Sequence, residues 1–134
     1  MYSNEVLNRF KNPKFAGALR GANAIGKAGS DACGDIVKIY LLVDEDGVIS
    51  LAKFKAFGGV STIVACDEAC EILAGLSLEE ALSLTSDEIF DQFQGGVPQD
   101  KAYSTVVVEE AINNAVEDYY KRKEREERKA SQAE

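Results

Sequence analysis

The chain has 134 residues, of which 23 are acidic and 15 basic, so its formal net charge is -8. This charge argues against nucleic acid and anionic membranes as partners, because both would repel the chain. No apolar run reaches the roughly 18 residues that a membrane span needs, and residues 1–9 lack a signal-peptide core. We therefore expect a cytosolic protein with a single domain, residues 1–134.

The first part of the chain predicts a small β-sheet. Residues 1–15 have helical character that stops near Pro13, and the Gly- and Ala-rich stretch Gly17–Gly34 is expected to be a loop with room for one extended piece. Two strands follow, Ile36–Val43 and Val48–Phe57. The turn residues Asp44–Gly47 between them favour an antiparallel hairpin.

The rest of the chain predicts helices. After Gly58-Gly59 the apolar residues recur with the period of a helix, Val60–Ala74, which Gly75 ends. Ser77–Glu80 and Thr85–Glu88 each resemble a capping box that opens a short helix. A last helix, Tyr103–Arg122, runs into a charged tail, 124–134, that we expect to project and fray. The fold class is thus α+β: a small antiparallel sheet with helices packed on one face.

Three cysteines are the candidates for metal chemistry, because the chain has no histidine. Cys33 and Asp35 stand in a glycine-containing loop before the first strong strand, and a thiol with a nearby carboxylate can bind zinc, iron or an iron–sulfur cluster. Cys66 and Cys70 share one face of a predicted helix. The same stripe carries Ile63 and Leu73, so core packing is favoured over metal binding for this pair.

Enzymatic chemistry has little support in the sequence. Ser104 has no histidine to activate it, and the glycine pairs at 58–59 and 95–96 lack the flanking residues of a phosphate-binding loop. Paired carboxylates lie mostly on predicted helix surfaces, where solvated charge is their usual role. We therefore expect a protein that is not an enzyme.

Several segments, taken in order, resemble the IscU/NifU-type iron–sulfur cluster assembly scaffold family. They are Tyr2-Ser3, Asp31–Asp35, Ala52–Lys55, Leu76–Ala81 and Val97–Lys101, and the likeness runs from Tyr2 to about Lys123. The resemblance implies the family's scaffold fold. It also implies a [2Fe–2S] cluster or a single iron or zinc ion as cargo, with a cysteine desulfurase as partner and a chaperone that recognises Val97–Lys101.

The resemblance also shows where this chain departs from the family. Family members bind the cluster with three cysteines and an aspartate, and here Cys33 and Asp35 occupy two of those positions. The second cysteine position is Gly59 and the third is Ser104, preceded by Tyr103. Ser104 cannot carry the persulfide sulfur that the third cysteine receives. Further candidate ligands are Cys66, Cys70, Tyr103, Ser104 and residues of a second subunit in a homo-oligomer.

Two functions follow from this pattern. One is a scaffold- or carrier-like protein of iron–sulfur cluster assembly with a degenerate cluster site. The alternative is a metal-free paralogue that acts as a docking or regulatory partner of the assembly machinery. Both predict that five residues meet at one end of the domain, namely Cys33, Asp35, Gly59, Tyr103 and Ser104.

Overall fold

The computed structural model describes residues 3–30, 32, 34–90 and 102–133, without the side chains of residues 86, 90, 102–105 and 133. Its strands are β1 (Ala24–Ser30), β2 (Asp35–Val43) and β3 (Ile49–Phe57). The helices of the described part are α1 (Asn4–Lys11), α2 (Val60–Leu73), α3 (Leu78–Leu82), α4 (Ser86–Phe90) and α5 (Ala102–Ala133).

The three strands form one antiparallel sheet in the order β1-β2-β3. The predicted hairpin between β2 and β3 is confirmed. Its turn is stabilised by the Asp44 carboxylate, which accepts hydrogen bonds from the backbone N–H groups of Asp46 and Val48 at 2.9 and 3.0 Å. Gly47 adopts a φ of 78°, a conformation that glycine reaches without steric cost.

Strand β1 occupies much of the stretch that the sequence predicts as loop. Its inward residues are small, because α5 lies unusually close to it. A Cβ atom added at Gly26 would overlap the backbone of Ala111 and Ala115 in α5. The Gly- and Ala-rich composition therefore reflects tight strand–helix packing and not only a loop.

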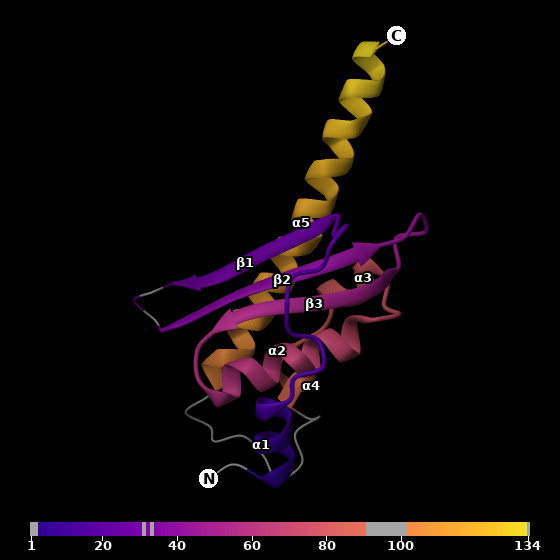
Figure 1. Ribbon diagram of the computed structural model, residues 1–134. Coiled ribbons are helices and arrows are strands. Elements are labelled where there is room, and N and C mark those ends of the chain that lie inside the picture. Colours follow the sequence, from indigo (N-terminus) through magenta and orange to yellow (C-terminus); the bar gives the residue numbers. More distant parts are fainter. Residues whose placement is uncertain (1–2, 31, 33, 91–101, 134) are drawn as a thin grey trace.

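Helices α2 and α5 cover one face of the sheet, as predicted, and Figure 1 shows α5 passing behind the strands and α2 next to β3. The core lies between these layers and contains the inward side chains of β2 and β3 with the apolar faces of both helices. Its largest fully buried members are Phe54, Ile39, Leu41, Ile49, Leu73, Ile89 and Ile112. Such burial supplies the main favourable free energy of folding.

The helix ends follow the sequence signals closely. Gly75, with a φ of 97°, comes directly after the end of α2. Ser77 and Glu80 form the predicted capping box of α3. At α4 the Thr85 hydroxyl accepts a hydrogen bond from the Glu88 N–H at 3.2 Å, which satisfies one of the unpaired donors of the first turn.

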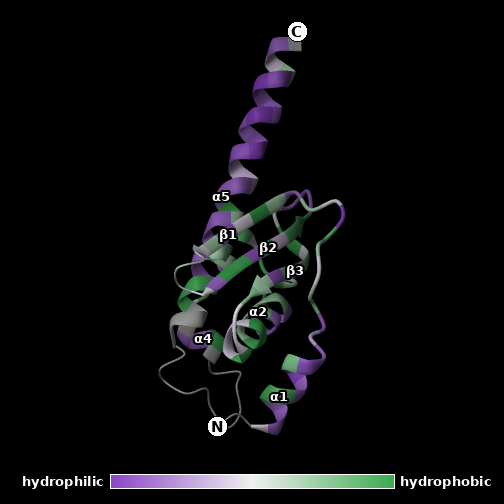
Figure 2. Ribbon diagram, turned by 60° about the vertical axis from the view of Figure 1, so that its left-hand side comes forward, coloured by the Kyte–Doolittle hydropathy of each residue, from purple (hydrophilic) through white to green (hydrophobic). Residues whose placement is uncertain are grey.

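Helix α5 continues well past the predicted end at Arg122, as far as Ala133. Figure 2 shows that its last turns project from the domain and are hydrophilic all round. Glu124 and Arg128 form an ion pair of the i,i+4 type there, at 3.8 Å, which favours helix. Whether this exposed segment frays stays a prediction. None of the helices in the described part is long and apolar enough to cross a membrane.

Candidate functional site

Asp35 is the first residue of β2, and its carboxylate lies at the start of α2. The Thr62 hydroxyl donates a hydrogen bond of 2.6 Å to Asp35 Oδ1. Thr62 is buried, so the bond fixes the carboxylate in one orientation. A Cβ atom added at Gly58 would overlap Asp35 Oδ1, so the glycine at this position leaves the space that the carboxylate occupies.

Gly59 follows Gly58 in the chain and is the N-cap residue of α2. It has no side chain to cap the helix, and its backbone is extended, with φ of -81° and ψ of -172°. No atom lies within 4 Å of a Cβ atom built at Gly59. Any L-residue therefore fits at this position without backbone strain or steric overlap.

The first turn of α5 points toward the same end of the sheet. Along β1, the Arg122 guanidinium contacts the Ala22 carbonyl and the Asn114 amide contacts the Lys27 carbonyl, so helix and strand run antiparallel. Ten helical residues before Asn114 span about 15 Å, whereas three strand residues beyond Lys27 span about 10 Å. The backbone of Tyr103 and Ser104, within α5, therefore lies on the side of the sheet where β1 ends and β2 begins, about 5 Å past the end of β1.

The structure places Asp35 at the start of β2 and Gly59 at the start of α2, and the first turn of α5, with Tyr103 and Ser104, lies toward the same end of the sheet; whether these residues meet stays a prediction. The side chains of Tyr103 and Ser104 lie outside the described residues, and so does Cys33. The separation of Cys33 from Ser104 therefore stays a prediction. The proposed chaperone segment, Val97–Lys101, also lies outside the described residues.

Cys66 and Cys70 lie in α2 and are completely buried in the core, as expected. Burial raises the pKa of the Cys66 thiol well above its usual range, and the charges of Cys70, Asp67 and Asp35 act in the same direction. Burial also raises the pKa of Cys70. Metal ions bind the thiolate form, so this environment opposes metal binding by either residue.

The donor set at this end does not fit a two-iron cluster held by one copy of the chain. One oxygen of Asp35 is already engaged by Thr62, and Gly59 contributes no side-chain donor. A [2Fe–2S] cluster is usually held by four ligands, most of them thiolates. Cys33 and Asp35 can supply at most one thiolate and one carboxylate. A single metal ion, or a cluster that takes some ligands from another molecule, requires fewer ligands from this chain.

A family model for the "NifU-like N terminal domain" matches residues 1–126, nearly the whole chain. The chain belongs to the NifU-like N-terminal domain family. The resemblance in the sequence is therefore confirmed, and with it the fold.

Relatives with established names support this membership. The chain is 34% identical over 122 residues to "Iron-sulfur cluster assembly scaffold protein IscU 1" of Archaeoglobus fulgidus, covering 91% of this chain and 78% of that protein. It is 30% identical over 126 residues to the protein IscU of Escherichia coli, covering 92% and 97%. Its identity to "Nitrogen fixation protein NifU" of Azotobacter chroococcum is 40% over 119 residues, which are 88% of this chain but 38% of that protein.

Solved structures show the same fold at lower identity. A putative iron–sulfur cluster assembly scaffold protein of Fervidobacterium islandicum superposes with a TM-score of 0.67 at 18% identity, covering 86% of this chain and 96% of that one. A NifU-like protein from Brucella abortus gives a TM-score of 0.69 at 14% identity, covering 89% and 94%.

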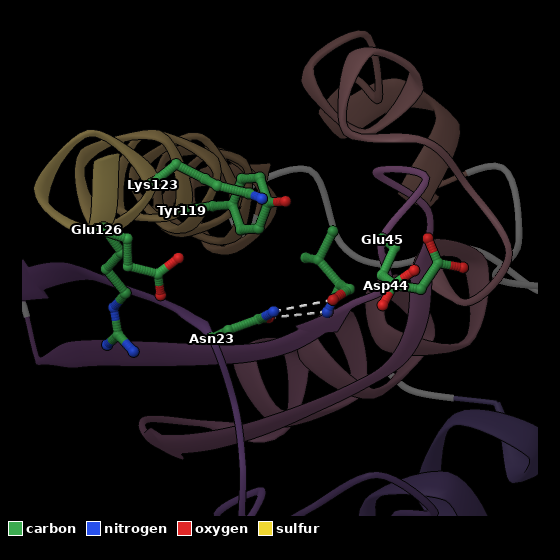
Figure 3. A pocket seen from close by; sticks show the side chains of 8 residues that line it. Asn23, Asp44, Glu45, Tyr119, Lys123 and Glu126 are labelled. Carbon is green, nitrogen blue, oxygen red and sulfur yellow. Dashed lines mark hydrogen bonds between the residues drawn. The ribbon is translucent and has the colours of Figure 1, made fainter. Parts of the chain in front are cut away.

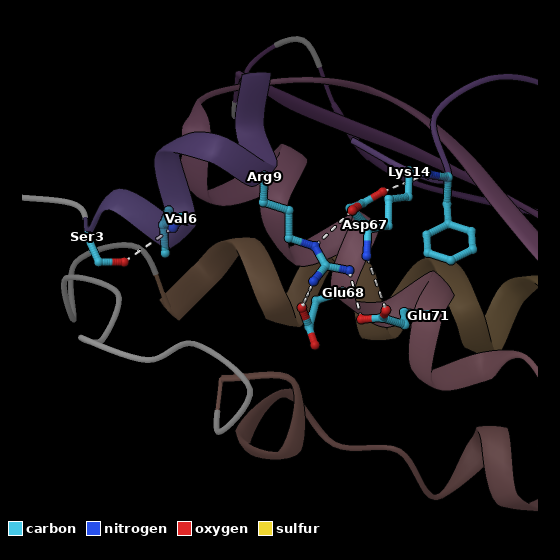
Figure 4. A network of polar contacts seen from close by, with 8 residues as sticks. Ser3, Val6, Arg9, Lys14, Asp67, Glu68 and Glu71 are labelled. Atoms are coloured by element: carbon cyan, nitrogen blue, oxygen red, sulfur yellow. Dashed lines mark hydrogen bonds and ion pairs between the residues drawn. The ribbon is translucent and has the colours of Figure 1, made fainter. Parts of the chain in front are cut away.

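One charged network of this NifU-like domain was not foreseen from the sequence. Arg9 of α1 contacts three carboxylates of α2 (Figure 4): Asp67 at 2.8 Å, Glu71 at 3.0 Å, and Glu68. Asp67 also accepts a hydrogen bond of 2.8 Å from the backbone N–H of Phe15. The network ties the N-terminal segment to the helix whose first turn adjoins Asp35. The only feature of the sequence that could have indicated this network is the presence of acidic residues in the otherwise apolar helix α2.

A surface hollow of about 220 Å³ lies at the opposite end of β2 from Asp35 (Figure 3). Its lining carries charges of both signs, including Asp44, Glu45 and Lys123. Asn23 at its edge is engaged in two hydrogen bonds of 2.8 Å with the backbone of Val43, which extend the sheet. The hollow has no lining residue in common with the Asp35 end.

Proposed function

We propose that this protein is a scaffold- or carrier-like component of iron–sulfur cluster assembly with a degenerate cluster site. The observation that carries the proposal is the match to the family model over residues 1–126. It is supported by the Asp35 carboxylate, which Thr62 holds in place, and by the resemblance, which puts Gly59 at a position where the family has a cysteine. The related proteins named IscU are described as scaffolds for this process. The role is non-catalytic and cytosolic.

Because there is open space at Gly59, a cysteine can be introduced there, and this allows a direct test. Wild-type protein and a Gly59→Cys/Ser104→Cys variant are each incubated anaerobically with iron and sulfide, and visible absorption and iron content are measured. We expect the variant to gain cluster absorption and the wild type to bind substoichiometric iron. Ser83→Cys, which places a thiol on the exposed end of α3, is the matched control and should gain nothing.

A stoichiometric cluster in wild-type protein that survives Cys33→Ser would contradict the degenerate site. A cluster in wild-type protein that disappears in Cys33→Ser and is found only in a dimer would instead establish ligands from a second copy. If neither wild-type nor repaired protein takes up iron, the metal-free docking or regulatory role becomes the better description, because Asp35 and Gly59 would then serve no metal.

The sulfur-transfer step supplies a second test. The partner we propose is a cysteine desulfurase, whose persulfide sulfur is attacked by an acceptor thiolate; a hydroxyl is too weakly acidic to replace it. After incubation with a desulfurase and cysteine, mass spectrometry should show little persulfide on wild-type protein and a clear gain on Ser104→Cys. Persulfide on wild-type protein that persists in Cys33→Ser would show that Cys66 or Cys70 is the acceptor.

The proposed chaperone contact rests on the resemblance of Val97–Lys101 to a family segment with proline and lysine. A peptide of residues 95–103 should compete with the whole protein for the family's chaperone, measured by fluorescence anisotropy. A peptide with Pro98 and Lys101 both replaced by alanine is the control. Equal competition by both peptides would remove this partner from the proposal.

A further inference from the structure

The sheet has a second face that the long helices do not cover. Val37, Ile39 and Phe54 point toward α2 and α5 and are buried, so the alternate residues of the strands point the other way. The outward residues of the two outer strands include Lys27 in β1 and Lys53 and Lys55 in β3. Lys38 and Tyr40 of β2 lie between them.

Three of these lysines form one row across the sheet. Lys27 is directly opposite Lys38, and Lys38 is directly opposite Lys55. Opposed residues on one face of a sheet lie about 5 Å apart, and like charges at that distance destabilise the fold. Lys38 has a contact with the ring of Tyr40 at 5.2 Å. Within the described part of the chain, none of the three has an ion pair with a carboxylate.

Among the described residues, the strands and the crossing segment place no carboxylate on this face to offset the row. None of the outward positions of the three strands is acidic. The segment that crosses this face, residues 14–23, carries Lys14 and Arg20 and no carboxylate. It pairs with β3 at Ala16 and reaches β1 beyond Asn23, and Figure 1 shows it passing in front of β2 and β3. The chain as a whole has a net charge of -8, so this basic face contrasts with its overall composition.

The crossing segment leaves the Asp35 half of the face open. The next outward pair beyond the lysine row is Ile36 and Phe57. Phe57 is 74% exposed, the highest value among the large apolar residues that are exposed in the described chain. An exposed aromatic ring therefore lies beside three lysines without ion pairs. A partner can pack an apolar side chain on the ring and place negative charge next to the lysines.

We propose that this half-face, defined by Lys27, Lys38, Lys55, Ile36 and Phe57, docks an acidic segment of another protein that also carries a large apolar side chain. The acidic side chains pair with the lysine row, and the apolar side chain packs on Phe57. The face is about 10 Å across three strands and extends a similar distance along them, so the contact is small and dissociable. The interaction does not require a cluster.

A protein segment fits better than the other polyanions. Nucleic acid and anionic membranes extend far beyond three lysines and would meet the acidic remainder of the molecule, which repels them. A short acidic segment meets only the half-face. It also offers an apolar side chain to Phe57, which a phosphate backbone does not.

The test uses a short synthetic peptide in which glutamate alternates with leucine and phenylalanine, labelled with a fluorophore. Anisotropy titration of the whole protein should show binding that weakens as salt is added. Lys27→Gln/Lys38→Gln/Lys55→Gln should weaken it about tenfold, as expected for three partly exposed ion pairs. Phe57→Ser should weaken it independently of salt. The matched control is Lys121→Gln/Lys123→Gln/Lys129→Gln, which removes the same charge from the α5 end and should leave affinity unchanged.

Carbodiimide cross-linking followed by mass spectrometry locates the contact, and we expect cross-links at Lys27, Lys38 or Lys55. Equal affinity of the half-face variant and the α5 control variant would overturn the proposal. So would tighter binding of a DNA oligonucleotide or of phosphatidylserine vesicles than of the peptide. A concentration-dependent dimer of wild-type protein that the half-face variant loses would assign the surface to a second copy of this chain instead.

Discussion

At the scale of single residues, the backbone around Asp35 and the identity of the side chain at residue 59 can be considered separately. Around Asp35, Gly58 leaves room for the carboxylate and Thr62 orients it by a hydrogen bond. The change at residue 59 is confined to the side chain, because the glycine has ordinary extended backbone angles and open space around it. A larger side chain at residue 59 would therefore need no change in the fold.

The helix cysteines should behave as core residues. In a Cys33→Ser variant, Cys66 and Cys70 are the remaining thiols, and both are fully buried with raised pKa values. We expect an alkylating reagent to modify them about a thousandfold more slowly in the native protein than in denaturant, because modification requires unfolding. Mass spectrometry of timed samples measures both rates. Native labelling as fast as in denaturant would contradict this packing.

At the scale of elements, β1 packs against α5 so closely that a Cβ atom at Gly26 would overlap the helix backbone. Replacing Gly26 by alanine forces strand and helix apart, because the obstacle is the backbone of Ala111 and Ala115 and not a movable side chain. We expect a loss of about 3 kcal/mol in the free energy of unfolding. Urea denaturation followed by circular dichroism measures it.

Gly59→Ala is the matched control for that substitution, since a Cβ atom at residue 59 meets nothing. Its effect should stay below about 1 kcal/mol, the usual range for an N-cap change. If both variants unfold at the same urea concentration, β1 does not approach α5 as closely as described.

The same element shows how far the sequence predicts this fold. The hairpin, α2 and α3 follow from local signals, because turn residues, helical periodicity and a capping box each act within a few residues. Strand β1 was foreseen only as a loop with room for an extended piece, because its Gly26 is explained by a helix far along the chain. Asp35 was singled out as a carboxylate close to a cysteine in a glycine-containing loop, whereas Gly59 came only from the family resemblance. The bond from Thr62 joins residues 27 positions apart and has no local signal.

At the scale of the whole molecule, charge is distributed unevenly. The outer face of the sheet is basic within a strongly acidic chain, and the helical side collects carboxylates, some of them buried. Asp67 and Glu68 of α2 are both buried and depend on Arg9 of α1 for compensation. Arg9 thereby holds α1 against α2 on the helical side of the domain. The chain then crosses the outer face of the sheet to reach β1.

Arg9→Ala should therefore destabilise the protein by about 3 kcal/mol, since it leaves buried carboxylates without their partner. Lys14→Ala is the control, because Lys14 is 68% exposed and its contact with Glu71 is long, 3.9 Å. We expect it to change stability by less than about 0.5 kcal/mol. Urea denaturation gives both values, and hydrogen exchange should show faster exchange of the α1 amides in Arg9→Ala alone.

The dependence on pH distinguishes a lost charge partner from a merely lost contact. Burial raises the pKa of Glu68, while Arg9 lowers it, so removing Arg9 raises it further. A carboxyl with a raised pKa in the folded state binds its proton more tightly there. It therefore favours folding at low pH, and this contribution is lost as the pH rises through the folded-state pKa. The deficit of Arg9→Ala should thus be larger at neutral than at mildly acidic pH. A deficit that is constant across that range would mean that Arg9 acts through packing, with the buried carboxylates already protonated.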